Sequence, residues 1–262
     1  MQDLLNVAIA QCPANLSGAR NRLNWLSDIL AQKKGEAIDL LLLPELFHCG
    51  YHIGKTVKEI AEPRDGRFFD EISCLAKQYH CAICYGYAEL EDGKLYNSAQ
   101  CVSKDAQRIG HHRKLILPPG FEGDHFSEGD RCELFTLGAF KVAILICYDV
   151  EFPENLRHVA KAGADLVIVP TALATQWGVV AEKLVPTRAF ENGVFVAYAN
   201  YCGQENDLSY YGGSRVVSPC GEALVIAADQ AALISADLQL CEVAKAQQRL
   251  PYHKDLLALP WR

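Results

Sequence analysis

The stretch Phe140-Lys-Val-Ala-Ile-Leu-Ile-Cys147-Tyr-Asp-Val-Glu-Phe-Pro153-Glu154 carries the strongest structural signal in the sequence. Its first seven residues are mostly apolar and predict a buried strand that ends at Cys147. Pro153 and Glu154 can open a helix, because proline lacks the N–H group that is unpaired in the first helical turn anyway. A thiol between a strand end and a helix start lies where α/β sheets present their chemistry, and nearby backbone amides can favour a thiolate. We therefore interpret Cys147 as a nucleophile.

Strands and helices alternate on both sides of this stretch. We expect strands over 6–12, 40–45, 140–147, 164–170 and 194–200, a hairpin over 81–102 that turns at Asp92-Gly93, and short strands near 215–217, 222–227 and 233–238. Helical spacing predicts helices over 16–32, 68–79, 153–161 and 177–192. The segment 108–131 is rich in Pro, Gly and His, and we interpret it as a long functional loop. The pattern predicts one α/β domain over residues 1–262, with mixed sheets and helices on the outer faces.

Composition narrows the class of protein. The chain has 262 residues, half of them apolar, and a net charge of −7, which argues against nucleic acid or an anionic membrane surface as a partner. The N-terminus lacks a basic region and a signal-like apolar stretch, and apolar runs such as 39–44 are far too short to span a membrane. We therefore expect a cytoplasmic protein.

The eleven cysteines are expected to be reduced thiols, because the chain is long and well supplied with core residues. Cys81 and Cys84 have C-x-x-C spacing, but they lie in an apolar strand-like run without a second pair, so a redox or zinc site there is the weaker interpretation. His111 and His112 are neighbours in a strand-like run and would point to opposite faces. We expect neither a metal nor a cofactor.

Glu45 and Lys114 are two further charged residues that are candidates for the active site. Glu45 directly follows the apolar run 40–44, so its carboxylate emerges where a buried strand ends; a solvated glutamate is an equally good interpretation in isolation. Lys114, in the stretch 111–120, would by itself most often be a surface lysine. Together with Cys147 they form a more specific pattern.

The combination of Leu-Leu-Pro-Glu45, Arg-Lys114 and Ile-Cys147-Tyr-Asp-x-x-Phe-Pro-Glu resembles the nitrilase superfamily of carbon–nitrogen hydrolases. The similarity extends from the first strand through 169–172, 188–192 and 212–221 and covers nearly the whole chain. The Cys-Tyr-Asp sequence, and Glu122 eight positions after Lys114, resemble the aliphatic and ω-amino amidase branches more than true nitrilases.

This resemblance implies a four-layer α-β-β-α sandwich that forms a homodimer or a higher homo-oligomer. It also implies roles: Cys147 attacks the carbonyl carbon, and Glu45 takes the thiol proton, protonates the leaving ammonia and activates water. Lys114 and the backbone N–H of Tyr148 would stabilise the oxyanion. Glu122 would be an additional carboxylate that positions the substrate and the lysine.

Several neighbouring residues keep two interpretations. Asp149 and Glu151 flank the nucleophile, and helix caps are at least as good an interpretation as catalytic roles. Tyr51, Trp177 and Tyr201 could wall the acyl pocket, although aromatic side chains more commonly pack in cores; we favour Tyr51. A Cys-His dyad built on Cys147 is unnecessary once Glu45 and Lys114 are included.

The expected function is hydrolysis of a small aliphatic carboxamide to acid and ammonia through a thioester. A short ω-amino amide is the substrate suggested by the resemblance. A nitrilase and an N-carbamoyl-amine hydrolase remain alternatives, because the same three groups serve all three reactions. An inactive scaffold on the same fold is the alternative outside the enzymes.

Overall fold

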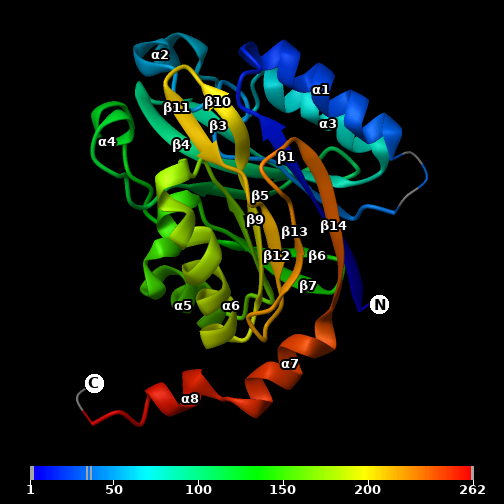
Figure 1. The fold of residues 1–262 in the computed structure, drawn as a ribbon, viewed down its shortest axis with the longest axis vertical. Coiled ribbons are helices and arrows are strands. Elements are labelled where there is room, and N and C mark those ends of the chain that lie inside the picture. Colours follow the sequence, from blue (N-terminus) through cyan, green and yellow to red (C-terminus); the bar gives the residue numbers. More distant parts are fainter. Residues whose placement is uncertain (1–2, 34, 36, 261–262) are drawn as a thin grey trace.

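The computed structural model describes residues 3–33, 35 and 37–260 (Figure 1). Its centre is built from two β-sheets. The first has the strand order β11-β10-β1-β2-β3-β4-β5, with β14 paired to β1, and the second has the order β13-β12-β9-β8-β7-β6. Strands β7, β8 and β9 run parallel to one another, as do β10, β1, β2 and β3. The remaining pairs, among them β1–β14, are antiparallel. Both sheets are therefore mixed, as predicted.

The strands of the first sheet are β1 (Leu4–Pro13), β2 (Leu40–Leu42), β3 (Ala82–Glu91), β4 (Lys94–Val102), β5 (Arg108–Arg113), β10 (Tyr201–Glu205), β11 (Leu208–Tyr211) and β14 (Ala232–Gln239). The strands of the second are β6 (Leu134–Leu137), β7 (Phe140–Ile144), β8 (Leu166–Pro170), β9 (Phe195–Ala199), β12 (Arg215–Val217) and β13 (Ala223–Ile226). The β3–β4 hairpin turns at Asp92 and Gly93, whose φ angles of 50° and 74° are those of the turn predicted from Asp-Gly.

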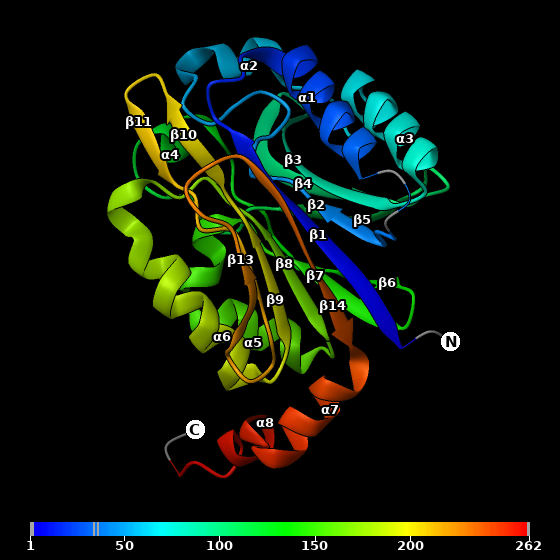
Figure 2. The ribbon, with the colours of Figure 1, turned by 45° about the vertical axis from the view of Figure 1, so that its right-hand side comes forward.

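Helices cover the outer face of each sheet (Figures 1 and 2). Helices α1 (Gly18–Gln32) and α3 (Arg67–Tyr79) pack on the first sheet, and α5 (Pro153–Lys161) and α6 (Val185–Asn192) pack on the second. The layers are thus α-β-β-α, as the resemblance implied. Among the helices of the described residues, none is both long and apolar enough to cross a membrane.

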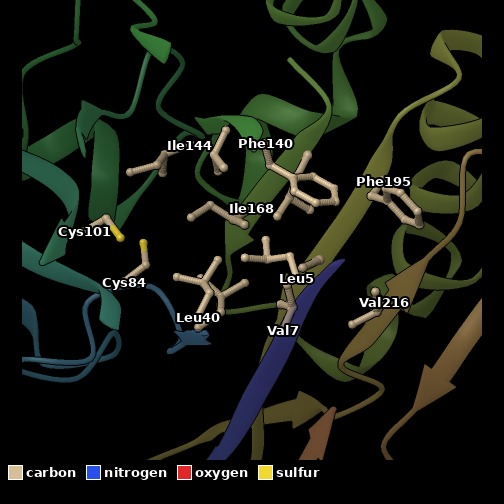
Figure 3. Close-up of a cluster of buried hydrophobic side chains, with 14 of the residues drawn as sticks. Leu5, Val7, Leu40, Cys84, Cys101, Phe140, Ile144, Ile168, Phe195 and Val216 are labelled. Atoms are coloured by element: carbon tan, nitrogen blue, oxygen red, sulfur yellow. The ribbon is translucent and has the colours of Figure 1, made fainter. Parts of the chain in front are cut away.

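The core lies between the two sheets. Leu5, Val7 and Leu40 from the first sheet meet Phe140 and Ile168 from the second (Figure 3), and all five are at most 3% exposed. Period-2 alternation explains this, because one face of each sheet packs against the other sheet and the opposite face packs against helices. Cys84 and Cys101, which face each other across β3 and β4, belong to this core and are free thiols.

Several sequence-based boundaries need correction. The stretch 108–131 is not wholly loop, because it contains β5 and the short helix α4 (Phe121–His125). The polar sequence of β5 forms a strand because it pairs with β4. The expected helix 177–192 is divided into a 3₁₀ turn η3 (Thr175–Trp177), a π-helical turn η4 (Val180–Leu184) and α6. Regular strand structure ends at Leu42 and Ile144, so Glu45 and Cys147 follow their strands through short connecting segments.

Some elements had no predicted counterpart. These are β6, β10, β11, the turn η1 (Gly54–Thr56), the short helix α2 (Val57–Ile60) and the C-terminal helices α7 (Leu240–Arg249) and α8 (Tyr252–Leu256). Helices α7 and α8 extend away from the sheets (Figures 1 and 2).

Candidate active site

Glu45 lies in the loop that follows β2 and is fully buried. The next residue, Leu46, has a φ of 49°, an unusual value for a residue with a side chain, and such strain clusters at functional sites. The loop packs directly on β3, where a Cβ atom on Gly86 would lie 2.3 Å from the Leu46 nitrogen. The Tyr201 hydroxyl donates to the Glu45 carbonyl at 2.9 Å. The backbone around Glu45 is therefore held from two sides.

Lys114 follows β5 and is fully buried as well. Its Nζ donates to Glu45 Oε1 at 2.7 Å and to Glu122 Oε1 at 2.6 Å, and Glu122 on α4 is 1% exposed. One ammonium thus bridges two buried carboxylates. Glu45 and Lys114, which are 69 positions apart in the sequence, therefore meet with Glu122 in one cluster.

Asn97 completes this cluster, and the sequence reasoning missed it. Its Nδ2 donates to Glu45 Oε1 at 2.7 Å and to Glu122 Oε2 at 2.9 Å. Asn97 lies on β4 and is fully buried. A polar amide in the middle of a buried strand needs partners, and that requirement is the signal that could have identified it.

Cys147 begins the 3₁₀ turn η2 (Cys147–Glu151) with a φ of 43°. It is half-buried and packs against the core between the sheets. Glu45, Lys114 and Glu122 all act electrostatically on its thiol, so the four groups share one neighbourhood. The N–H of Tyr148 lies in the first turn of η2, where backbone N–H groups lack partners within the helix. Its role as an oxyanion donor stays a prediction.

The environment sets the protonation states. Burial and the negative charge of Glu45 raise the pKa of the Cys147 thiol, which outweighs the opposite effect of Lys114. Burial raises the pKa of Glu45 to about 7; Lys114 opposes this shift and Glu122 adds to it. Burial alone would lower the pKa of Lys114, but Glu122 and Glu45 reverse that and raise it. The nucleophile therefore rests as a thiol beside a carboxylate that titrates near neutrality and a permanently charged ammonium.

The two carboxylate oxygens of Glu45 differ in their hydrogen bonds to the described residues. Oε1 accepts from Lys114 and Asn97, whereas the buried Oε2 accepts no hydrogen bond from the described residues. A buried acceptor without a partner is costly and at an active site points to a role in proton transfer. Oε2 is therefore the atom of Glu45 that is suited to take a proton.

The aromatic candidates differ in position. The Tyr51 hydroxyl donates to Glu122 Oε1 at 2.7 Å, which joins Tyr51 to the charged cluster. Tyr201 is buried and supports the Glu45 backbone instead. Trp177 in η3 is 58% exposed. Pocket roles for Tyr51 and Trp177 stay predictions.

Asp149 is fully buried, and its Oδ2 accepts the N–H of Ile146 at 3.0 Å, as expected for a cap of η2. His111 and His112 turn to different partners, Glu89 and Asp149. Among the residues that the structure describes, no three His, Cys, Asp or Glu side chains are grouped so that they could hold a metal ion.

Comparison with known proteins identifies a family and individual relatives. The carbon-nitrogen hydrolase family model matches residues 6–248. A relative from Pseudomonas protegens, described as a hydrolase in the pqqF 5' region, is 40% identical over 250 residues, which cover 94% of this chain and 87% of the relative. An (R)-stereoselective amidase from a Pseudomonas species is 33% identical, with 83% and 79% covered.

The crystal structure of an amidase from a Nesterenkonia species is similar throughout. Its TM-score is 0.85 at 30% identity, with 96% of each chain covered. A variant structure of that amidase carries acrylamide added to its active-site cysteine. With a family model that matches most of its length, the chain belongs to the carbon-nitrogen hydrolase family, in the nitrilase superfamily. The resemblance found in the sequence and the predicted enzyme class are therefore confirmed.

Proposed function

We propose that this protein is a cysteine-dependent amidase that hydrolyses a small aliphatic carboxamide to a carboxylic acid and ammonia. One observation carries the proposal: Lys114 bridges two buried carboxylates, Glu45 and Glu122, in the neighbourhood of Cys147. A thiol, a base that titrates near neutrality and a fixed cation are the groups that acyl transfer from an amide needs.

The chemistry follows from the protonation states. Glu45 Oε2 takes the thiol proton as Cys147 Sγ attacks the carbonyl carbon, and Lys114 and the Tyr148 N–H stabilise the oxyanion. Collapse of the tetrahedral intermediate breaks the C–N bond, and Glu45 delivers its proton to the leaving ammonia. Glu45 then takes a proton from water, which attacks the thioester carbonyl. The C–S bond breaks, Glu45 returns the proton to Cys147 Sγ, and the acid is released. The raised pKa of Cys147 makes this base necessary, because the thiol is not already ionised.

The structural relatives support an amide as the substrate. Variants of the Nesterenkonia amidase have been crystallised with butyramide and with acrylamide, two short uncharged amides. A pair of sheets that superposes at a TM-score near 0.85 leaves substrate choice to the loops and side chains around the nucleophile.

Glu151 supports an amine-bearing amide within this class. Its side chain is half-buried at the end of η2, and burial raises the pKa of its carboxyl. Lys114 and Arg188 both act electrostatically on this carboxyl, but Lys114 is bridged by Glu45 and Glu122, and Arg188 donates to the backbone carbonyl of Glu151 and pairs with Glu191. A carboxylate in this position can bind an ammonium group at the far end of a short substrate. We therefore include ω-amino amides such as 5-aminopentanamide in the proposed substrate class.

A panel of substrates tests the proposal. We expect purified protein to release ammonia and acid, without CO2, from 5-aminopentanamide and hexanamide and not from nitriles or carbamoyl amines. Release of CO2, or hydrolysis of nitriles instead of amides, would establish one of the alternative enzymes. Cys147→Ala should abolish turnover and remain folded, whereas Cys74→Ala, at an exposed cysteine on α3, should keep it. Turnover by Cys147→Ala would overturn the mechanism, and no turnover of any substrate by the wild type would favour an inactive scaffold.

The same assay tests the role of Glu151. Glu151→Gln should lower kcat/KM for 5-aminopentanamide about tenfold, as expected for the loss of one ionic hydrogen bond, and leave hexanamide unaffected. Glu154→Gln, at an exposed glutamate in the first turn of α5, is the matched control. Equal effects on both amides would exclude recognition of the substrate amine by Glu151 and would leave the amidase assignment unchanged.

A further inference from the structure

Asp149 connects the two catalytic segments through a single carboxylate. Its Oδ2 accepts the N–H of Ile146, the residue before the nucleophile, at 3.0 Å. Its Oδ1 accepts the N–H groups of Leu115 and Ile116, which directly follow Lys114, at 3.0 and 3.1 Å. The side chain of Asp149 is fully buried. The same group therefore fixes the backbone next to Cys147 and the backbone next to Lys114.

His112 supplies the opposing charge. Its Nε2 lies 3.0 Å from Asp149 Oδ2, and its side chain is 1% exposed. His112 lies on β5, two residues before Lys114, so the lysine segment contacts Asp149 from both directions. Among the described residues the Asp149 carboxylate therefore has four hydrogen-bond partners, two on each oxygen.

The backbone at Cys147 needs such support. A φ of 43° for a residue with a side chain costs about 1–3 kcal/mol and persists where neighbouring contacts determine it. The Asp149 carboxylate reaches back over this residue to Ile146, and the Asp149 N–H donates to the Ile146 carbonyl at 2.9 Å. Asn155 Nδ2 donates to the Asp149 carbonyl at 3.0 Å. These contacts hold the turn that presents the thiol.

We propose that Asp149 and His112 are a positioning pair that keeps Cys147 and Lys114 in a fixed relation during catalysis. This inference rests on the proposed function, because it assigns the two residues to the same reaction. Neither residue touches the substrate. Their effect is on how often the thiol and the ammonium reach the same carbonyl group in the correct geometry.

The charge state of His112 belongs to this inference. Burial alone would lower the pKa of His112, but the hydrogen bond to Asp149 and the Cys132 side chain raise it to about 9. The charged and titratable groups that line a cavity of 110 Å³ with His112 are Arg64, His111, Arg113, Asp130, Arg131 and Glu133. All three of these arginines are already paired with acidic residues: Arg64 and Arg113 with Glu89 and Glu91, and Arg131 with Asp130. His112 is thus cationic at neutral pH and loses its charge near pH 9.

Two substitutions test the pair, with kcat expressed per active site titrated by the acylation burst. Asp149→Asn replaces an acceptor oxygen by a donor that opposes a backbone N–H, and we expect kcat to fall about 100-fold with little change in KM, the size typical of a misplaced catalytic group. His112→Gln keeps a donor to Asp149 without the charge and should lower kcat about tenfold. It should also abolish the decline in kcat near pH 9 that the wild type is expected to show.

Asp165→Asn is the matched control. Asp165 also accepts a backbone N–H from β7, that of Lys141 at 2.8 Å, but at the opposite end of the strand from Cys147. It should leave kcat and the pH profile unchanged. Wild-type kcat per active site in Asp149→Asn, or an unchanged decline near pH 9 in His112→Gln, would overturn the inference.

A second readout does not depend on turnover. The rate at which iodoacetamide alkylates Cys147 reports the geometry of the thiol and Glu45, and it should fall in Asp149→Asn but not in Asp165→Asn. If the wild type hydrolyses no amide, the proposed function fails while this comparison remains valid. If Asp149→Asn does not fold, His112→Gln and its pH profile decide the matter. Unchanged alkylation in a folded Asp149→Asn protein would also overturn the inference.

Discussion

Two fully buried glutamates of the first sheet have opposite surroundings. Glu89 on β3 has partners on both carboxylate oxygens: Arg64 at 2.7 Å and Arg113 on Oε1, and Ser98 at 2.6 Å and His111 at 2.8 Å on Oε2. Glu45, in the loop after β2, shares one ammonium with a second carboxylate, and its Oε2 accepts no hydrogen bond from the part of the chain that the structure describes.

The different surroundings shift the pKa values of the two carboxyl groups in opposite directions. Burial alone would raise the pKa of Glu89, but hydrogen bonds from His111, Arg113 and Ser98 hold it far below its usual range. Burial, with Glu122 nearby, raises the pKa of Glu45 to about 7 despite Lys114. A buried carboxylate with an excess of cations serves structure, whereas one that competes for a single cation can exchange a proton near neutral pH. Burial and a nearby cation alone do not distinguish the two cases.

Exchanging each glutamate for glutamine gives the largest expected contrast. Glu45→Gln should lower kcat about 10³-fold, because it removes the base, and should bind substrate without an acylation burst. Glu89→Gln should keep kcat per active site but lower the free energy of unfolding by about 3–5 kcal/mol, because it leaves buried cations without their partner. Burst kinetics and urea unfolding measure both. A normal acylation burst in Glu45→Gln would contradict the comparison, as would wild-type stability in Glu89→Gln.

The His112–Asp149 pair adds a pH dependence of stability. Because folding raises the pKa of His112 from its usual 6.5 to about 9, the pair contributes stability below pH 6.5 and loses it as the pH rises through 9. The expected loss is about 3 kcal/mol. Urea unfolding between pH 6 and 10 should show this loss in the wild type and in His158→Gln, at an exposed histidine on α5, but not in His112→Gln. The same slope in His112→Gln would exclude this histidine as its source.

The smallest expected effect concerns the pKa of Glu45, read from the acidic limb of kcat/KM. Glu122→Gln removes a charge that raises this pKa, so the limb should move to lower pH by about one unit. Asn97→Ala removes a hydrogen bond that lowers it, so the limb should move to higher pH. Asp124→Asn, at an exposed position of α4, should leave the limb near pH 7. Shifts in the same direction for Glu122→Gln and Asn97→Ala would show that Glu45 is not the group observed.

The catalytic groups were accessible from the sequence because each follows an apolar run or stands in a specific motif. Glu45 and Cys147 come directly after apolar runs, and Lys114 and Glu122 belong to the resemblance. Asn97 and the partners of Asp149 could not be identified from the sequence, because their importance lies in hydrogen bonds between residues 25 to 52 positions apart. Local patterns carry no record of such contacts.

The fold likewise has elements that the sequence predicted and elements that it did not. Alternating apolar strands and amphipathic helices predicted α1, α3, α5 and the β3–β4 hairpin to within about three residues. Strand β5 escaped prediction because its polar sequence is strand-forming only when paired with β4. The helix expected over 177–192 contains Pro186 and departs from regular geometry before α6. Strand pairing therefore determined the structure of β5, and the interruption around Pro186 determined that of the expected helix.

Gly86 has a consequence for how members of this family are recognised as active or inactive. It carries no functional group, yet one added methyl would collide with the backbone of Glu45 and Leu46. A homologue with alanine at this position would retain every catalytic side chain and lose the geometry of its base. An inventory of catalytic residues would classify such a protein as an enzyme. Selection for the reaction therefore acts on a position that takes no part in it.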